Sequence, residues 1–198
     1  MINSIPAALV VFRFLIGPFL LWDALDGQTS IWFIAGFVAA FLSDIFDGII
    51  ARRLKISTAG LRQADSWADR CLYICVFSSA WLVNKDLVIA FRIPLLTVVF
   101  AQLMWWIVNL LKYGKPASYH SYSAKIWGIT LFIATIAWFS LDRAGIALWL
   151  AIIVGILHTL EEIAMTLILP IWKHDVLSIY HAINLRRQLN TQTATTEN

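Results

Sequence analysis

The chain has 198 residues, of which 60% are hydrophobic and only 14% are charged, and its formal net charge is +3. A soluble domain is about 45–50% apolar and about 25% charged. This composition excludes a soluble enzyme, a disordered protein and a coiled coil. The basic residues form no patch of the kind that binds nucleic acid. The composition therefore predicts an all-α, polytopic membrane protein.

Six segments are long and apolar enough to cross a bilayer, which takes about 20 residues of helix. They cover residues 7–25, 31–53, 66–84, 87–111, 124–141 and 145–171. The first does not look like a cleaved signal, so we expect it to remain as a span. Short connections join the spans into one transmembrane domain, residues 1–183. The polar, Thr-rich segment 184–198 is expected to be a disordered tail.

The distribution of basic residues predicts the orientation, because cytoplasmic connections carry an excess of Lys and Arg. Eleven of the fifteen basic residues fall at the connections after the second, fourth and sixth spans. Three fall on the opposite side, and Arg13 lies inside the first span. Both termini are therefore expected to be cytoplasmic.

The second span carries two acids, Asp44 and Asp47, near its end. An ionised Asp inside a span costs at least about 2.5 kcal/mol, so it needs a nearby cation or water. At about 100° per residue, these acids share one face of about 140° with Gly48, Ala51 and Arg52. The two small residues leave room for a bulky ligand against the helix, and Arg52 is placed to hold a phosphate.

The third span opens with Asp65 and Asp69, which are four residues apart and so share a helix face. Because the connection between the two spans is short, the four carboxylates are expected to converge near the cytoplasmic membrane surface. Divalent cations would relieve their mutual repulsion, and oxygen ligands favour Mg²⁺, Mn²⁺ or Ca²⁺. The alternative is simple pairing of the acids with the nearby arginines, which explains neither the doubled spacing nor the small residues.

The pattern Asp44-x2-Asp47-Gly48-x2-Ala51-Arg52, followed by Asp65-x3-Asp69, resembles the signature of the CDP-alcohol phosphotransferase (phosphatidyltransferase) family. Size and span number are similar to those of its small bacterial members, such as phosphatidylglycerophosphate synthases. The resemblance implies an enzyme of the bacterial cytoplasmic (inner) membrane with its active site on the cytoplasmic side. It also implies a homodimer.

The resemblance further implies a role for each residue of the motif. One or two Mg²⁺ or Mn²⁺ ions would be held by Asp44, Asp47, Asp65 and Asp69, and Asp69 would take the proton of the acceptor hydroxyl. The cytidine diphosphate of the donor would contact Gly48, Ala51, Arg52 and Gly60. The chain departs from the family at one point, because Leu61 stands where the family has its second glycine and Gly60 comes one residue earlier.

Other polar residues are further candidates for the site. Arg13 is a charge inside a span and is expected to point at the site. Together with Arg62 and Lys125 it is a possible contact for the acceptor or a phosphate. In the sixth span, Glu161 and Glu162 are either functional acids or structural partners of Arg13 or a neighbouring helix.

These features predict a phosphatidyltransferase that moves the phosphatidyl group of CDP-diacylglycerol to a polar alcohol acceptor and releases CMP. Glycerol 3-phosphate is the favoured acceptor, and another alcohol such as inositol phosphate is the alternative. Two further hypotheses are a divalent-cation transporter that uses the acids as a selectivity ring, and a catalytically silent member that only binds lipid.

Overall fold

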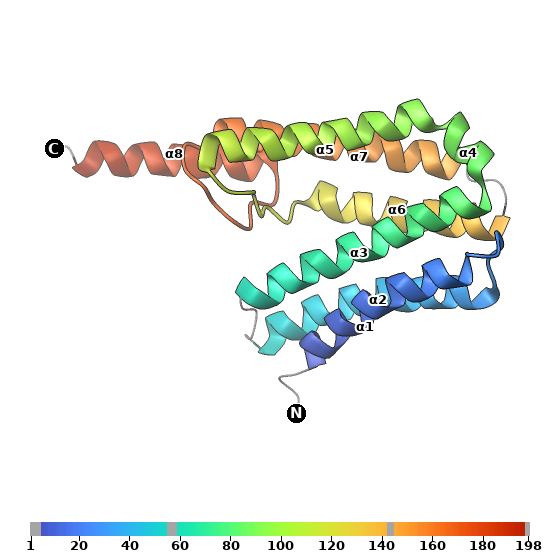
Figure 1. Cartoon of the computed structure of the whole chain (residues 1–198). Coiled ribbons are helices and arrows are strands. Elements are labelled where there is room, and N and C mark those ends of the chain that lie inside the picture. Colours follow the sequence, from blue (N-terminus) through green and yellow to red (C-terminus); the bar gives the residue numbers. More distant parts are fainter. Residues whose placement is uncertain (1–4, 55–58, 142–144, 197–198) are drawn as a thin grey trace. The chain divides into compact units, whose positions relative to one another are not determined.

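The computed structural model describes residues 5–54, 59–141 and 145–196, and these ranges are almost entirely helical (Figure 1). They contain no β-strand beyond one isolated bridge, between Ser118 and His174. The chain separates into two compact units, Met1–Ala90 and Phe91–Asn198. Helices are expected here, because a span in lipid must satisfy its backbone hydrogen bonds internally.

The first unit consists of α1 (Ile5–Asp23), α2 (Ile31–Leu54), α3 (Ala59–Val83) and the short α4 (Lys85–Ala90). α1 packs against both α2 and α3 (Figure 1). The turn between α1 and α2 is fixed by Ser30, whose backbone N–H and hydroxyl donate to the carboxylate of Asp23 at 2.9 and 2.6 Å. The Ser30 hydroxyl also accepts from the N–H of Trp32, so Ser30 caps the start of α2.

One buried stripe runs along α1, at the spacing of a helix face: Pro6, Val10, Arg13, Gly17 and Leu20. Gly17 allows a close approach of two helix backbones in this unit. A Cβ atom at this position would lie 3.2 Å from the backbone Cα of Leu72 in α3. The missing side chain therefore lets α1 and α3 pack backbone to backbone, one helical turn from Arg13.

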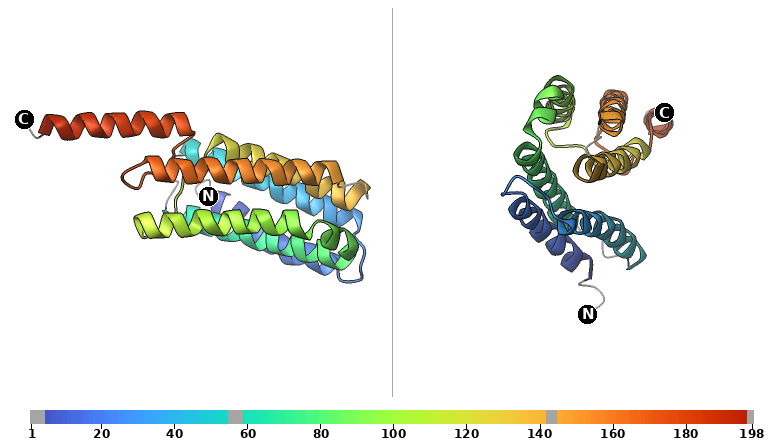
Figure 2. Two further views of the ribbon diagram at one scale, coloured as in Figure 1. Left: turned by 90° about the horizontal axis from the view of Figure 1, so that it is seen from above. Right: turned by 90° about the vertical axis from the view of Figure 1, so that its right-hand side faces the viewer.

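The second unit consists of α5 (Arg92–Tyr113), α6 (Tyr122–Leu141), α7 (Gly145–Ile168) and α8 (Ile179–Thr196). α7 packs against α5, α6 and α8, and the two views in Figure 2 show it beside these helices. At the α6–α7 contact, Gly155 faces the indole of Trp127 so closely that a Cβ atom there would lie 2.5 Å from the indole nitrogen. The same indole stacks on His158 with the ring centroids 5.2 Å apart.

The connection from α5 to α6 lies against the segment between α7 and α8. The backbone N–H of Asp175 donates to the carbonyl of Ser118, and that of Tyr122 donates to the carbonyl of Leu177. Lys112 and Tyr113, at the end of α5, donate to backbone carbonyls at the end of α7. A small apolar core holds this end of the unit together: Tyr119, Met165, Leu169, Val176 and Ala182.

Within the described ranges, five helices are long and apolar enough to span a membrane: α1, α2 up to Ile50, α5, α6 and α7. The expected third span is present as the 25-residue α3, which is not among these five. Its first half carries four charged residues, so its mean hydropathy falls below that of the others. At about 1.5 Å per residue a helix of this length still reaches across a bilayer.

Two predicted boundaries differ from the structure. The expected span 87–111 is divided at Phe91 into α4 and α5, and Pro94 lies in the first turn of α5, where a missing N–H breaks no helical hydrogen bond. The segment 184–198, expected to be disordered, is helical as far as Thr196. Good helix formers such as Leu185, Arg186 and Arg187 extend α8 through its polar part.

Candidate metal centre

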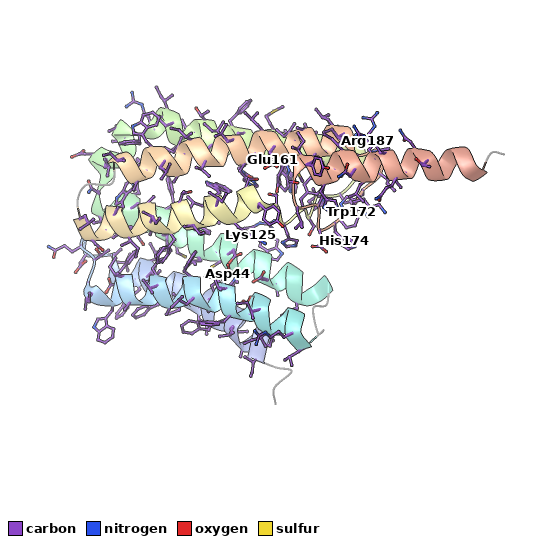
Figure 3. The ribbon with its side chains drawn as sticks, turned by 180° about the vertical axis from the view of Figure 1, so that it is seen from behind. Asp44, Lys125, Glu161, Trp172, His174 and Arg187 are labelled. Carbon is purple, nitrogen blue, oxygen red and sulfur yellow. The ribbon has the colours of Figure 1, made fainter. Side chains whose placement is uncertain are left out.

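The acidic residues of α2 lie toward the interior of the first unit. Asp44 and Asp47 are separated by three positions and therefore lie on one face of α2. The side chain of Asp47 is 7% exposed and that of Asp44 is 45% exposed, so one carboxylate is buried and the other reaches solvent or headgroups. Figure 3 shows Asp44 on this helix.

The acids of α3 face the same place. The side chains of Asp65 and Asp69 are 34% and 37% exposed, one helical turn apart. One carboxylate oxygen from each of Asp44, Asp47 and Asp65 lies within 4.8 Å of the others. The structure thus brings together three of the four predicted metal ligands as a group that could hold an ion.

Arg13 of α1 lies in the middle of the four carboxylates. Its side chain is completely buried, and its Nη1 atom donates to Asp65 at 2.7 Å and to Asp69 at 2.6 Å. Nη1 also lies 2.9 Å from Asp44, and Nη2 donates to Asp47. A single guanidinium therefore contacts all four aspartates, two on each of two helices.

The sequence did not reveal one neighbour of this cluster, Ser43. Its hydroxyl is buried, donates to the carbonyl of Ala40 at 2.7 Å, and lies 3.5 Å from Nε of Arg13. A serine one position before an acid of a span is too common a pattern to single out from the sequence. In the structure it orients the guanidinium from the side of α2.

The donor set fits a hard divalent cation. All ligands are carboxylate oxygens, which suit Mg²⁺, Mn²⁺ or Ca²⁺ better than zinc or copper. With all four acids ionised, the single positive charge of Arg13 leaves three negative charges uncompensated. A cation is therefore attracted to this place, and three of the acids are exposed enough for it to enter.

The structure describes only some of the residues that are predicted to contact the donor. Gly48 is half-buried next to Asp47, and Gly60 is exposed in the first turn of α3, with open space where a Cβ would be. Leu61 follows Gly60 in the same helix. The side chains of Ala51, Arg52 and Arg62 lie outside the part that the structure describes.

Lys125 belongs to the second unit, where it lies exposed in the first turn of α6 with its ammonium 5.3 Å from the ring centroid of Tyr122 (Figure 3). Tyr119, in the connection just before α6, is buried with its hydroxyl 2.9 Å from that of Thr166. Burial raises the pKa of this phenol, so it remains a neutral hydrogen-bonding group.

The two acids of α7 bind groups of their own unit. Glu161 accepts a hydrogen bond from the backbone N–H of Ile179, the first residue of α8, at 3.2 Å. A carboxylate at a helix start is favourable because the N–H groups there lack helical partners. Glu162 is buried and accepts from the hydroxyl of Ser121 at 2.9 Å. The sequence left open whether these two glutamates are functional acids or structural partners. These contacts support the structural alternative, with partners on neighbouring segments.

The fold and the acidic cluster together define an integral membrane protein with a candidate centre for a hard cation. The sequence profile of the family described as CDP-alcohol phosphatidyltransferase matches residues 3–181, which is most of the chain. The chain therefore belongs to this family. Its members transfer a phosphatidyl or related group from a CDP-alcohol to an alcohol acceptor, and they generally use divalent metals.

No curated protein and no solved structure matches the chain.

Proposed function

We propose that this protein is a metal-dependent phosphatidyltransferase that uses CDP-diacylglycerol as donor and glycerol 3-phosphate as acceptor. The observation that carries the proposal is the convergence of four aspartates from α2 and α3, at the positions of the family motif, on one small volume. The apolar helices α1 and α2, in the same unit as the aspartates, suit a donor with lipid tails and a polar head. We further propose six spans, with α3 as the third.

In this proposal Asp44, Asp47 and Asp65 bind the metal, and Asp69 contributes an oxygen to it. A divalent ion held there would neutralise the diphosphate of the donor and the charge on the departing CMP. Asp69 would accept the proton of the acceptor hydroxyl as the hydroxyl oxygen attacks the phosphatidyl phosphorus. The new P–O bond forms as the phosphoanhydride bond breaks, and CMP leaves with the bonding electron pair.

The partial exposure of Asp69 supports this division of roles. A general base must come within hydrogen-bond reach of the proton it removes. Asp69 is 37% exposed and can be approached, whereas Asp47 is 7% exposed and is better suited to hold a metal permanently. Gly48, Ala51, Arg52 and Gly60 would face the cytidine diphosphate, and Arg62 and Lys125 would contact a phosphate.

The test is a transfer assay with purified protein, CDP-diacylglycerol in mixed micelles with Mn²⁺, and a panel of radiolabelled alcohols that includes inositol phosphate. We expect CMP release that depends on glycerol 3-phosphate. If labelled lipid forms from inositol phosphate alone, then inositol phosphate is the acceptor and glycerol 3-phosphate is not. Failure of every acceptor to release CMP would contradict the enzymatic proposal, and would leave a cation transporter or a lipid-binding protein.

Two further properties belong to the proposal. We infer that the site lies on the cytoplasmic side of a bacterial inner membrane, because most basic residues fall at connections on that side. We also infer a homodimer, because α3 and α5 carry many exposed apolar side chains that a partner could bury. A monodisperse monomer in both mild detergent and nanodiscs would contradict the dimer.

A further inference from the structure

The position of Arg13 has a consequence for metal binding. Its Nη1 atom lies within 2.9 Å of carboxylate oxygens from three aspartates on two different helices. Its Nη2 atom contacts the fourth aspartate. A guanidinium on a surface normally pairs with one carboxylate, often through two parallel hydrogen bonds. Here one guanidinium is instead surrounded by oxygens from four carboxylates, as a bound metal ion would be.

The hydrogens of Nη1 are too few for this arrangement. A guanidinium NH₂ group carries two hydrogens. Among the described residues, Nη1 donates them to Asp65 and Asp69, and Asp44 is held only by an ion pair. Asp44 is also the most exposed of the four carboxylates, at 45%. A spherical cation has no such directional limit and could bind all three oxygens equally.

The aspartates that contact Arg13 include all three residues of the candidate metal group. Asp44, Asp47 and Asp65 form that group, and each contacts the guanidinium. A hard divalent cation binds carboxylate oxygens at about 2.0–2.6 Å. It would therefore lie within a few ångströms of Nη1, where two positive charges repel each other strongly. This repulsion opposes simultaneous binding of the guanidinium and the ion to the same carboxylates.

We propose that Arg13 is a built-in competitor of the divalent cation: it neutralises the four aspartates when no metal is bound, and metal loading displaces its guanidinium from them. The inference rests on the proposed metal site. It assigns Arg13 two opposite effects, because the same contacts that stabilise the metal-free helices weaken the affinity for metal. An arginine that only positioned the aspartates would favour both the stability of the metal-free protein and its affinity for metal. Loss of such an arginine would weaken both the stability and the affinity.

The experiment uses Arg13→Gln, which keeps a polar side chain but removes the charge. Free Mn²⁺ is measured by electron paramagnetic resonance during titration of the full chain in detergent, and the melting temperature is measured with and without chelator. We expect Mn²⁺ to bind at least tenfold more tightly than to the wild type. In chelator the variant should melt at a lower temperature than the wild type, and saturating Mn²⁺ should remove most of the difference.

Two variants serve as controls. Arg70→Gln removes the same charge from α3, where Arg70 is exposed and lies over the ring of Trp67. We expect neither Mn²⁺ affinity nor melting temperature to change much. Arg13→Lys keeps a charge at the same place and gives a second reading if Arg13→Gln cannot be purified. A single ammonium satisfies fewer carboxylates than a guanidinium, so Mn²⁺ should bind more tightly than to the wild type by a smaller factor.

The outcomes separate this inference from the proposed function. Unchanged or weaker Mn²⁺ binding by both Arg13 variants would overturn the competitor role while the metal site stands. Absence of Mn²⁺ binding by the wild type, together with absence of binding by Arg13→Gln, would overturn the metal site and with it the proposed function. Mn²⁺ binding by Arg13→Gln alone would support an especially strong competition.

Discussion

Replacement of Gly17 by alanine tests whether the close contact between α1 and α3 holds the site together. The new Cβ atom would lie 3.2 Å from Cα of Leu72. Carbon atoms normally approach to about 3.5–4.0 Å, so α1 must move away from α3 by a few tenths of an ångström. The obstacle is backbone, which no side-chain rotation can relieve.

Gly36 offers a matched control on α2. A Cβ atom there would be equally close to a neighbour, at 3.1 Å, but that neighbour is the terminal Cδ2 atom of the Leu20 side chain. Both replacements gain about 1 kcal/mol of helix propensity. Overpacking against backbone costs about 1–3 kcal/mol. We therefore expect Gly17→Ala to be less stable than Gly36→Ala by about 1 kcal/mol or more.

The assay is thermal or denaturant unfolding in detergent, followed by the fluorescence of the ten tryptophans. Gly17→Ala should also lower transfer activity more than Gly36→Ala does, because α1 would move against α3, the helix that carries Asp65 and Asp69. Equal stability of the two variants would refute the argument that backbone contact between α1 and α3 limits the packing at this position.

Three further predictions concern the chemistry of the site. Asp69→Asn should lower the transfer rate by about 10²–10⁴, the usual contribution of a general base, while affinity for CDP-diacylglycerol changes much less. Asp44→Asn should instead weaken Mn²⁺-dependent binding of the donor. Similar defects in both variants would contradict the division of roles. Chelation of divalent metal should abolish CMP release. Added Mg²⁺ or Mn²⁺ should restore it and Zn²⁺ should not, because the ligands are all oxygens. Full activity in chelator would exclude a catalytic role for a metal. Gly60→Ala should leave the melting temperature unchanged, because the space around Gly60 is open. It should weaken donor binding, measured by titration with CDP-diacylglycerol. Unchanged donor binding would exclude Gly60 from the nucleotide site.

Hydropathy alone predicted most of the helices but not where each one begins and ends. Five expected spans correspond to helices that are apolar enough to cross a membrane. α3 begins at Ala59, well before its apolar part, because polar and charged residues can form a helix as readily as apolar ones. The same reasoning applies to the polar end of α8, where the composition predicted disorder and the chain is helical as far as Thr196.

The proximity of the acids could be predicted because it depends on local geometry. Spacings of three and four residues place Asp44 with Asp47, and Asp65 with Asp69, on one face of their helices. The contacts of Arg13 could be predicted only in part, since they depend on which helices pack together. The α1 stripe contains Gly17 and therefore allowed a close neighbour, but nothing in the sequence identified that neighbour as α3.

The site and the fold of the first unit are inseparable for an electrostatic reason. Each charge buried in a span costs about 2.5–3.5 kcal/mol when it has no partner. Arg13 is completely buried, and the carboxylates that compensate it come from α2 and α3. Assembly of the three helices is therefore favoured by the same contacts that gather the candidate metal ligands. A fully apolar α1 would pack without Arg13, but it would leave the four aspartates to repel one another until a cation arrived.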